Sequence, residues 1–359
     1  MSRNNPAAPA RIFEVVECDA PGAAGEQVAA ICNGLDPAKF DVSLVYAARG
    51  ESPEEYRAKC RGAKAAYSMP ELTLRKLHRL FAEHRPDVVH AHSSKAGVLA
   101  RAAAKAAGIK TIFYSPHGYG FLMQDRSAAA RALDRTIESA AARVGATIAA
   151  SPNESAQAEL LGAKRVHVVR DAYLGEFPEP LPHDDLVVGS SGHMTRARNP
   201  DAWVLLVQRL TDSRNGVQCA WIGGGEEEAR TRTNLTNMNL LMKASVTGPL
   251  TVEETLQKSR GLDIFVRYSR ADAAPNALLR AMALGLPVVA SDIPAHRDVV
   301  VPGETGFLVD TEVQLLERCQ ELIDDADLRR RLGAGGRERV RREFSRERQL
   351  AELSRLYSA

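Results

Sequence analysis

The feature that most constrains this chain is a pattern that occurs twice, in which short apolar runs alternate with stretches of helical character. In the first half, runs typical of strands lie at 11–18, 40–46, 87–90, 111–114 and 147–151. Helical patterns lie between them at 26–35, 72–84 and 95–107. Such alternation is typical of a parallel sheet with helices on both faces, so we predict an α/β fold.

The pattern breaks at residues 171–185, where Pro178, Pro180 and Pro182 lie among acidic residues. It then restarts, with strands expected at 186–190, 218–222, 245–247, 263–268 and 287–291 and helices at 201–210, 252–259 and 276–283. Residues 325–357 are charged, and we expect them to be helical throughout. The 359 residues suffice for two domains, which we place at 1–175 and 186–340, with a last helix at 341–359. Two doubly wound domains in succession predict a cleft between them.

Composition narrows the class of protein. The net charge of +2, from 47 basic and 45 acidic residues, argues against a dedicated nucleic-acid binder. The first 175 residues carry +5 and the remainder −3, which fits either scattered solvated charge or a basic half that faces an anionic surface. No apolar run reaches membrane-spanning length, and the polar N-terminus does not read as a secretory signal. The five cysteines are far apart and suit a reducing cytoplasm: Cys18, Cys32, Cys60, Cys219 and Cys319.

Glycine-containing polar segments follow the strands of the first half. Gly22 and Gly25 frame a turn before a helix, which suits either an anion contact or a simple tight turn. His90 and His92 share one face of a strand, as a pair of metal ligands would. No third ligand follows at helical spacing, so we expect no metal. His117 lies in the segment SPHGYGF, where it can donate or accept a proton near neutral pH.

Similar segments follow the strands of the second half. Residues 190–200, SSGHMTRARNP, place cations in a glycine-started loop before a helix, an arrangement that suits phosphate oxygens. A GGGE segment follows the strand at 218–222, and 269–291 read SRADAAPNALLRAMALGLPVVAS. Asp325 and Asp327 form a D-x-D pair, which we interpret as the N-terminal cap of a surface helix.

Taken in order, these segments resemble the retaining glycosyltransferases of family 4, and the resemblance runs through nearly the whole chain. The residues that carry it are the turn at 22–25, HAHSSKAG, SPHGYGF, SGHMTRARNP, WIGGGE, PNALLRAMALGLPVVAS and GETGFLV at 303–309. The resemblance implies a GT-B fold, with two doubly wound Rossmann-like domains that face a central cleft. It also implies that the last helix returns to the first domain, and that no metal or other cofactor is needed.

The resemblance further implies roles for individual residues. The catalytic pair is His117 and Asp272. Donor binding falls to His193, Arg198, Gly224, Ala274, Pro275, Asn276, Ala277, Leu278 and Arg280. The acceptor side is lined by Gly22, Gly25, His92, Ser94 and Lys95.

Four positions depart from the family pattern. His193 and Arg198 replace an Arg and a Lys, Asp272 replaces a Glu, and Arg280 replaces the acid that usually accepts hydrogen bonds from ribose. The departures leave open whether donor recognition is rewired or catalysis is lost.

The resulting hypothesis is a cytoplasmic transferase that moves a sugar from a nucleotide-sugar donor to a glycan or lipid-linked acceptor in surface polysaccharide synthesis. The main alternative is a catalytically silent GT-B scaffold that assists another transferase, and a GT-B epimerase or phosphorylase is a third. We also expect peripheral contact with the inner face of the membrane, because basic residues flank the Leu77–Leu80–Phe81 face. These basic residues are Arg75, Lys76, Arg79 and Arg85. No nucleic-acid partner is expected.

Overall fold

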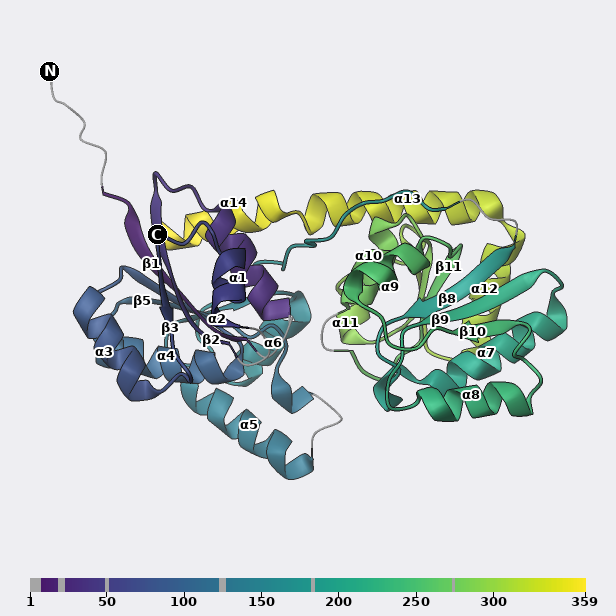
Figure 1. Cartoon of the computed structure of the whole chain (residues 1–359), viewed down its shortest axis with the longest axis horizontal. Helices are drawn as coiled ribbons and strands as arrows, with labels where there is room; N and C mark the ends of the chain where they lie inside the picture. The colour runs from purple at the N-terminus through teal and green to yellow at the C-terminus, as the bar shows by residue number, and fades with distance from the viewer. Residues whose placement is uncertain (1–7, 19–22, 49–51, 123–126, 182–184, 273–274) are drawn as a thin grey trace, which may run out of the picture. The chain divides into compact units, whose positions relative to one another are not determined.

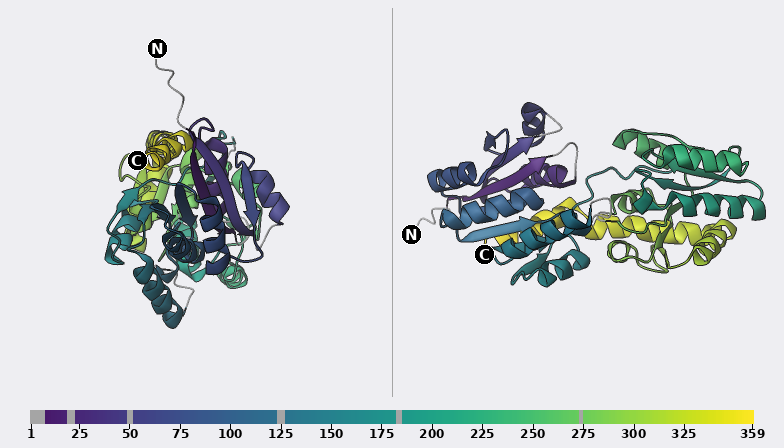
Figure 2. Two further views of the ribbon diagram at one scale, coloured as in Figure 1. Left: turned by 90° about the vertical axis from the view of Figure 1, so that its left-hand side faces the viewer. Right: turned by 90° about the horizontal axis from the view of Figure 1, so that it is seen from below.

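Parallel strands form where the sequence places its apolar runs. The computed structural model describes residues 8–18, 23–48, 52–122, 127–181, 185–272 and 275–359. They divide into two compact units. Unit 1 extends to Leu174 and includes Phe344–Ala359, whereas unit 2 comprises Gly175–Glu343. Each unit is built on one parallel sheet with helices on both faces (Figure 1, Figure 2).

Unit 1 contains a seven-stranded sheet in the order β3-β2-β1-β4-β5-β6-β7. Its strands are β1 Ala10–Cys18, β2 Phe40–Ala48, β3 Ala65–Ser68, β4 Val88–His92, β5 Thr111–Ser115, β6 Ala146–Ala149 and β7 Val166–Val168. Its helices are α1 Ala23–Gly34, α2 Pro53–Lys59, α3 Leu74–His84, α4 Ser94–Ala106, η1 Gly120–Leu122, α5 Ala128–Ala141, α6 Pro152–Leu160 and α14 Arg346–Tyr357.

Strand alternation divides the core of unit 1 into two layers. Ile12 and Val16 of β1 pack in one cluster with Val28 of α1 and Leu353 of α14. Phe13 and its neighbours pack in the other cluster with α3 and α4. Because side chains alternate along a strand, Glu14 of β1 lies on the face that α14 covers.

The C-terminal helix α14 lies beside α1, as Figure 1 shows within unit 1. Gln349 of α14 donates to Gln27 of α1 over 2.9 Å, and Arg346 donates to the Ala30 carbonyl over 3.1 Å. A Cβ on Gly34 would lie 2.3 Å from Leu350 Cδ1, so glycine permits this close approach.

Unit 2 contains a six-stranded sheet in the order β10-β9-β8-β11-β12-β13. Its strands are β8 Leu186–Ser191, β9 Val217–Ile222, β10 Ala244–Val246, β11 Ile264–Arg267, β12 Val288–Ser291 and β13 Gly306–Val309. Its helices are η2 Arg196–Arg198, α7 Pro200–Ser213, α8 Glu228–Asn237, α9 Val252–Ser259, α10 Asn276–Ala283, α11 Pro294–Arg297, α12 Glu312–Asp324 and α13 Ala326–Glu343.

One expectation from the sequence is wrong in detail. Residues 325–357 are not helical throughout, because α13 ends at Glu343 and Ser345, in extended backbone, caps α14 by accepting the Arg348 N–H. Leu77 and Phe81 of α3 are fully buried beside Phe13 in the core, so peripheral contact with a membrane stays a prediction that rests only on the exposed basic residues. The capping role of Asp325 is confirmed, since its side chain accepts the Leu328 N–H over 2.8 Å. In the described part of the chain, no helix combines the length and apolarity that a membrane span requires.

Candidate functional site

The candidate site of unit 1 lies where its sheet reverses strand order. The chain proceeds from β1 to β2 on one side and reaches β4 on the other, and ligands of doubly wound sheets bind at the carboxyl ends of such strands. Glu14 of β1 pairs in register with His90 of β4, and Val16 pairs with His92. Parallel pairing therefore brings one carboxylate and two imidazoles together inside the sheet's buried face.

A chain of hydrogen bonds connects these side chains to His117. His92 Nε2 lies 2.7 Å from Glu14 Oε2, and His92 Nδ1 lies 2.9 Å from His117 Nε2. His117 Nδ1 lies 2.8 Å from Asp171 Oδ2. The His92 and His117 rings stack with their centroids 5.2 Å apart. The site thus joins β1, β4, the loop after β5 and the segment after β7.

Counting protons assigns a charge to the imidazole pair. Carboxylates only accept hydrogen bonds, so His92 Nε2 and His117 Nδ1 both carry protons, and the bond between the rings needs a third. Two neutral imidazoles supply only two. This pattern of hydrogen bonds therefore needs one proton more than two neutral imidazoles hold.

The pKa shifts assign that charge to His117. Burial opposes a charge on the His117 ring, but Asp171 outweighs burial and raises its pKa. Burial lowers the pKa of His92, although Glu14 acts in the opposite direction. His92 is thus the neutral Nε2–H tautomer, whose Nδ1 accepts from an imidazolium at His117.

The backbone around His117 is strained and held in place. His117 has a φ of 53° and Ser93 a φ of 67°, in the left-handed region that most side chains avoid. The Ser93 N–H donates to the Ser115 carbonyl over 3.0 Å, and the Gly118 N–H donates to Glu154 Oε1 over 2.7 Å. These contacts hold the backbone on both sides of His117, the residue that the sequence predicted to act in catalysis.

A second branch of the network runs from Glu14 to the C-terminal helix. Tyr357 of α14 donates from its hydroxyl to Glu14 Oε1 over 2.8 Å. The Tyr357 hydroxyl oxygen lies 2.6 Å from His90 Nδ1, and His90 Nε2 lies 2.9 Å from Ser115 Oγ. Since the tyrosine proton goes to Glu14, His90 donates from Nδ1 and accepts at Nε2.

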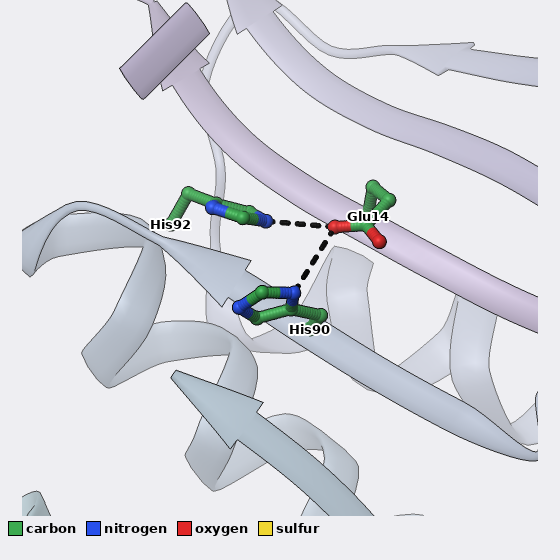
Figure 3. Close-up of side chains that lie close together, drawn as sticks. All are labelled: Glu14, His90 and His92. Carbon is green, nitrogen blue, oxygen red and sulfur yellow. Dashed lines mark hydrogen bonds and ion pairs between the residues drawn. The ribbon is translucent and has the colours of Figure 1, made fainter. Parts of the chain in front are cut away.

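Glu14, His90 and His92 could together offer three ligand atoms to a metal, all within 4.8 Å of one another (Figure 3). Both of the histidine nitrogens involved carry protons that they donate to oxygen. A cation would have to displace both protons from a fully buried position. The cluster therefore fits a hydrogen-bonded network better than a metal centre.

Among the residues expected on the acceptor side, His92 belongs to this network; it is fully buried and contacts Glu14 and His117 rather than solvent. Ser94, Lys95 and Gly25 lie apart from the network. Ser94 and Lys95 begin α4, and Lys95 is exposed and bonded to Glu17 over 2.9 Å. Gly25 lies in α1, where its carbonyl accepts the Tyr56 hydroxyl over 3.0 Å. Gly22 lies outside the described residues.

The candidate site of unit 2 occupies the equivalent reversal, where β8 lies between β9 and β11. Gly223 has a φ of 138°, and a Cβ there would lie 2.4 Å from the Gly192 carbonyl oxygen. The Met194 N–H donates to the Gly224 carbonyl over 2.9 Å. The glycines thus lock the loop after β9 against the loop after β8, which leaves His193 exposed.

Asp272 binds three cationic or protonatable groups through a single oxygen. Its Oδ2 forms an ion pair with Arg198, lies 3.3 Å from Arg267 Nη2 and lies 3.4 Å from His296 Nε2. The Asp272 side chain has no exposed surface, yet His296, Arg267 and Arg198 outweigh burial and lower its pKa well below the usual range. Burial lowers the pKa of Arg267 to about 10, although Asp272 opposes the change.

The predicted donor-binding residues divide between this cluster and helix α10. Arg198 and Asp272 are brought together, whereas Pro275, Asn276, Ala277 and Leu278 form the start of α10. Leu278 is fully buried, so only its backbone can reach a ligand. Arg280 is half-buried on the same helix, and Ala274 lies outside the described residues.

Sequence reasoning missed five members of the two clusters, and one of them is Asp171, which was read only as the start of the connection between domains. Glu14 and Tyr357 carry no local signal, because they meet only through strand pairing and the return of α14. Arg267 and His296 were also missed. The cation at the end of the apolar run Ile264–Arg267 is the signal that could have drawn attention to Arg267.

Comparisons with known proteins define the class. Residues 176–339 match the family model described as glycosyl transferases group 1, and residues 22–171 match the glycosyl transferase 4-like domain. The two models follow one another along most of the chain and fall on the two units. The chain therefore belongs to the glycosyltransferases of GT-B fold.

Individual relatives are distant. The Staphylococcus aureus capsular polysaccharide biosynthesis glycosyltransferase CapM is 27% identical over 192 residues, 52% of this chain and 49% of that protein. The Escherichia coli UDP-Gal:alpha-D-GlcNAc-diphosphoundecaprenol alpha-1,3-galactosyltransferase is 25% identical over 271 residues, 70% of this chain and 69% of that protein. The match thus spans about half the length of the first relative and about two thirds of the second.

Solved structures agree on the fold. Anabaena HepE, in complex with UDP and glucose, matches with a TM-score of 0.78 at 15% identity, covering 97% of this chain and 99% of that one. The lipopolysaccharide outer core galactosyltransferase WaaB matches with a TM-score of 0.74 at 16% identity, covering 96% and 98%.

Proposed function

We propose that this protein is a retaining, metal-independent glycosyltransferase that moves a hexosyl group from a nucleotide diphosphate sugar to a glycan or lipid-linked acceptor in surface polysaccharide synthesis. The observation that carries the proposal is the cationic cluster at the strand reversal of unit 2, where Arg198 and Arg267 surround Asp272. A leaving nucleoside diphosphate needs positive partners that are already in place, and fixed charges in a partly dry site supply them without reorganisation.

The relatives support the class of substrate. The E. coli relative is named for a UDP-galactose donor and a diphosphoundecaprenol acceptor, and CapM is named for capsular polysaccharide synthesis. We extend to this chain the use of a nucleotide-sugar donor and of a glycan or lipid-linked acceptor.

Within the proposal, the units have different tasks. Unit 2 binds the nucleotide diphosphate through the loop that carries His193 and Arg198, and through Asn276 and Arg280 of α10 with its first backbone N–H groups. Unit 1 presents His117, which its contact with Asp171 keeps protonated and oriented. A positively charged, fixed imidazole can stabilise negative charge that develops during transfer.

A catalytically silent scaffold remains the second candidate, because the partners of Asp272 cover its carboxylate. With no exposed side-chain surface, it reaches sugar hydroxyls only if the Arg198 contact opens. Binding and hydrolysis of nucleotide sugars by the purified full chain separate the two functions. An active transferase binds UDP or GDP and slowly hydrolyses one UDP- or GDP-activated sugar, whereas a scaffold does neither.

A further inference from the structure

The hydroxyl of Tyr357, at the end of α14, has no role in the reaction proposed above. The residue lies in the last turn of α14 and is 5% exposed. Phe40 and Phe113 contact its ring, with centroids 6.1 and 5.8 Å away. A hydroxyl buried among aromatic rings is costly unless it is hydrogen-bonded, and this one has two partners, Glu14 and His90.

Through these two partners, the Tyr357 hydroxyl determines which acceptor each histidine of β4 uses. The His90 and His92 rings lie 4.0 Å apart between centroids, and both point toward Glu14 (Figure 3). His90 Nδ1 is 3.5 Å from Glu14 Oε2, the oxygen to which His92 donates at 2.7 Å. Because the tyrosine oxygen accepts the His90 proton, Glu14 Oε2 is left to His92 alone.

Removing the Tyr357 hydroxyl would eliminate two hydrogen bonds. Glu14 Oε1 would lose its donor, and the nearest remaining acceptor for the His90 N–H would be Glu14 Oε2. His90 and His92 would then compete for one oxygen. His92 would no longer be confined to the Nε2–H tautomer, and its Nδ1 would not be a constant acceptor for His117.

We propose that Tyr357 is a positioning residue for His117: through Glu14 it confines His92 to the Nε2–H tautomer, which orients the His117 ring. Tyr357 touches neither His117 nor a substrate and is therefore not catalytic. The inference rests on the proposed function only in giving the orientation of His117 a consequence for sugar transfer. The C-terminal helix, distant in sequence from the other members, thereby completes a site in unit 1.

The tautomer of His92 can be read without any substrate, by ¹⁵N NMR of the full chain labelled at histidine. The test variant is Tyr357→Phe, which keeps the ring and removes the hydroxyl. The matched control is Tyr46→Phe, since Tyr46 donates to the Pro53 carbonyl over 2.7 Å in the same unit, outside the network. We expect wild type and control to show His92 as Nε2–H, and Tyr357→Phe to show a mixture of tautomers.

Activity provides the second readout. For the donor that wild type uses, kcat of Tyr357→Phe should fall about tenfold, the effect of one lost hydrogen bond, while KM for the donor changes less than threefold. An unchanged His92 tautomer in Tyr357→Phe overturns the proposal, and so does a changed tautomer with unchanged kcat. The tautomer shift in a protein that turns over no donor would instead contradict the proposed function alone.

A further variant leaves α14 untouched in case Tyr357→Phe does not fold. In Glu14→Gln the amide oxygen can still accept from Tyr357, while the amide N–H₂ then faces His92 Nε2, which must accept instead of donating. We expect His92 to change to the Nδ1–H tautomer. An unchanged Nε2–H tautomer of His92 in Glu14→Gln would show that Glu14 does not set it and would overturn the proposal.

Discussion

His117 donates a hydrogen bond from Nδ1 to Asp171 Oδ2 over 2.8 Å, joining the loop after β5 to the segment after β7. The contact combines a strained backbone at His117, a φ of 53°, with a carboxylate that is 31% exposed at its side chain. Backbone strain persists only where surrounding contacts hold it, and it concentrates at functional positions. The His117–Asp171 pair should therefore affect both turnover and the pH dependence of stability.

Replacing His117 by alanine should lower turnover about 10²-fold or more, because a fixed, protonated imidazole is lost near the reacting groups. Initial rates with the preferred donor measure the effect. His78→Ala is the control, since His78 is an exposed histidine on α3. Activity within a factor of three of wild type in His117→Ala would show that the ring has only a structural role.

Replacing Asp171 by asparagine should change how stability depends on pH. Asp171 raises the pKa of His117 above its ordinary value of 6.5. A raised pKa in the folded state stabilises the protein fully below pH 6.5, and this stabilisation disappears as pH rises through the raised pKa. Urea unfolding at pH 6 and pH 9 should show a smaller loss of stability with rising pH in Asp171→Asn than in wild type. Equal losses in both proteins would mean that this pair does not hold the proton.

Replacing Asp272 by asparagine should destabilise unit 2, because Arg198 and Arg267 would keep their charges without a counter-charge. Breaking a buried ion pair in this way costs about 3–5 kcal/mol. Chemical unfolding measures it, with Asp324→Asn as control, since Asp324 pairs with Arg214 at an exposed position. If Asp272→Asn were as stable as the control variant, the Asp272 cluster would not stabilise unit 2.

Arg280 and His193 should act together in donor binding. The resemblance to the family implies that Arg280 stands in place of an acid and His193 in place of an arginine, so that one positive charge has changed place. We expect Arg280→Glu alone to weaken nucleotide diphosphate binding by about 10–150-fold, because a charge-assisted contact is lost. Adding His193→Arg should restore much of the loss, so that calorimetry of the double-mutant cycle is strongly non-additive. Tighter binding by Arg280→Glu alone would contradict the exchange.

The sequence predicted the fold well because burial on both faces of a parallel sheet leaves long apolar runs. Short or half-exposed strands escaped notice, as with β3, none of whose residues is fully buried, and β7, where Val168 is 44% exposed. The last helix was expected to begin at residue 341, a few residues before Arg346, because α13 and α14 both have charged sequences and only the cap at Ser345 separates them.

The site could be predicted only in part, for a related reason. His92 and His117 both follow apolar runs, and a parallel sheet brings such segments to one edge, so each could be singled out from the sequence. Their connection to Glu14 and Tyr357 depends on which strands are neighbours and on where the last helix packs. Asp272 could likewise be singled out, but its confinement by Arg267 and His296 requires the three-dimensional fold.

Following the anomeric centre tests sugar transfer with retention. Purified full chain is incubated with UDP- and GDP-activated α-sugars and a lipid-linked or glycan acceptor, and the product is examined by NMR. A retaining transferase should give an α-linked product and release one nucleoside diphosphate per sugar transferred. A β-linked product would contradict retention, and a protein that neither binds nor turns over any donor would identify the chain as a silent scaffold.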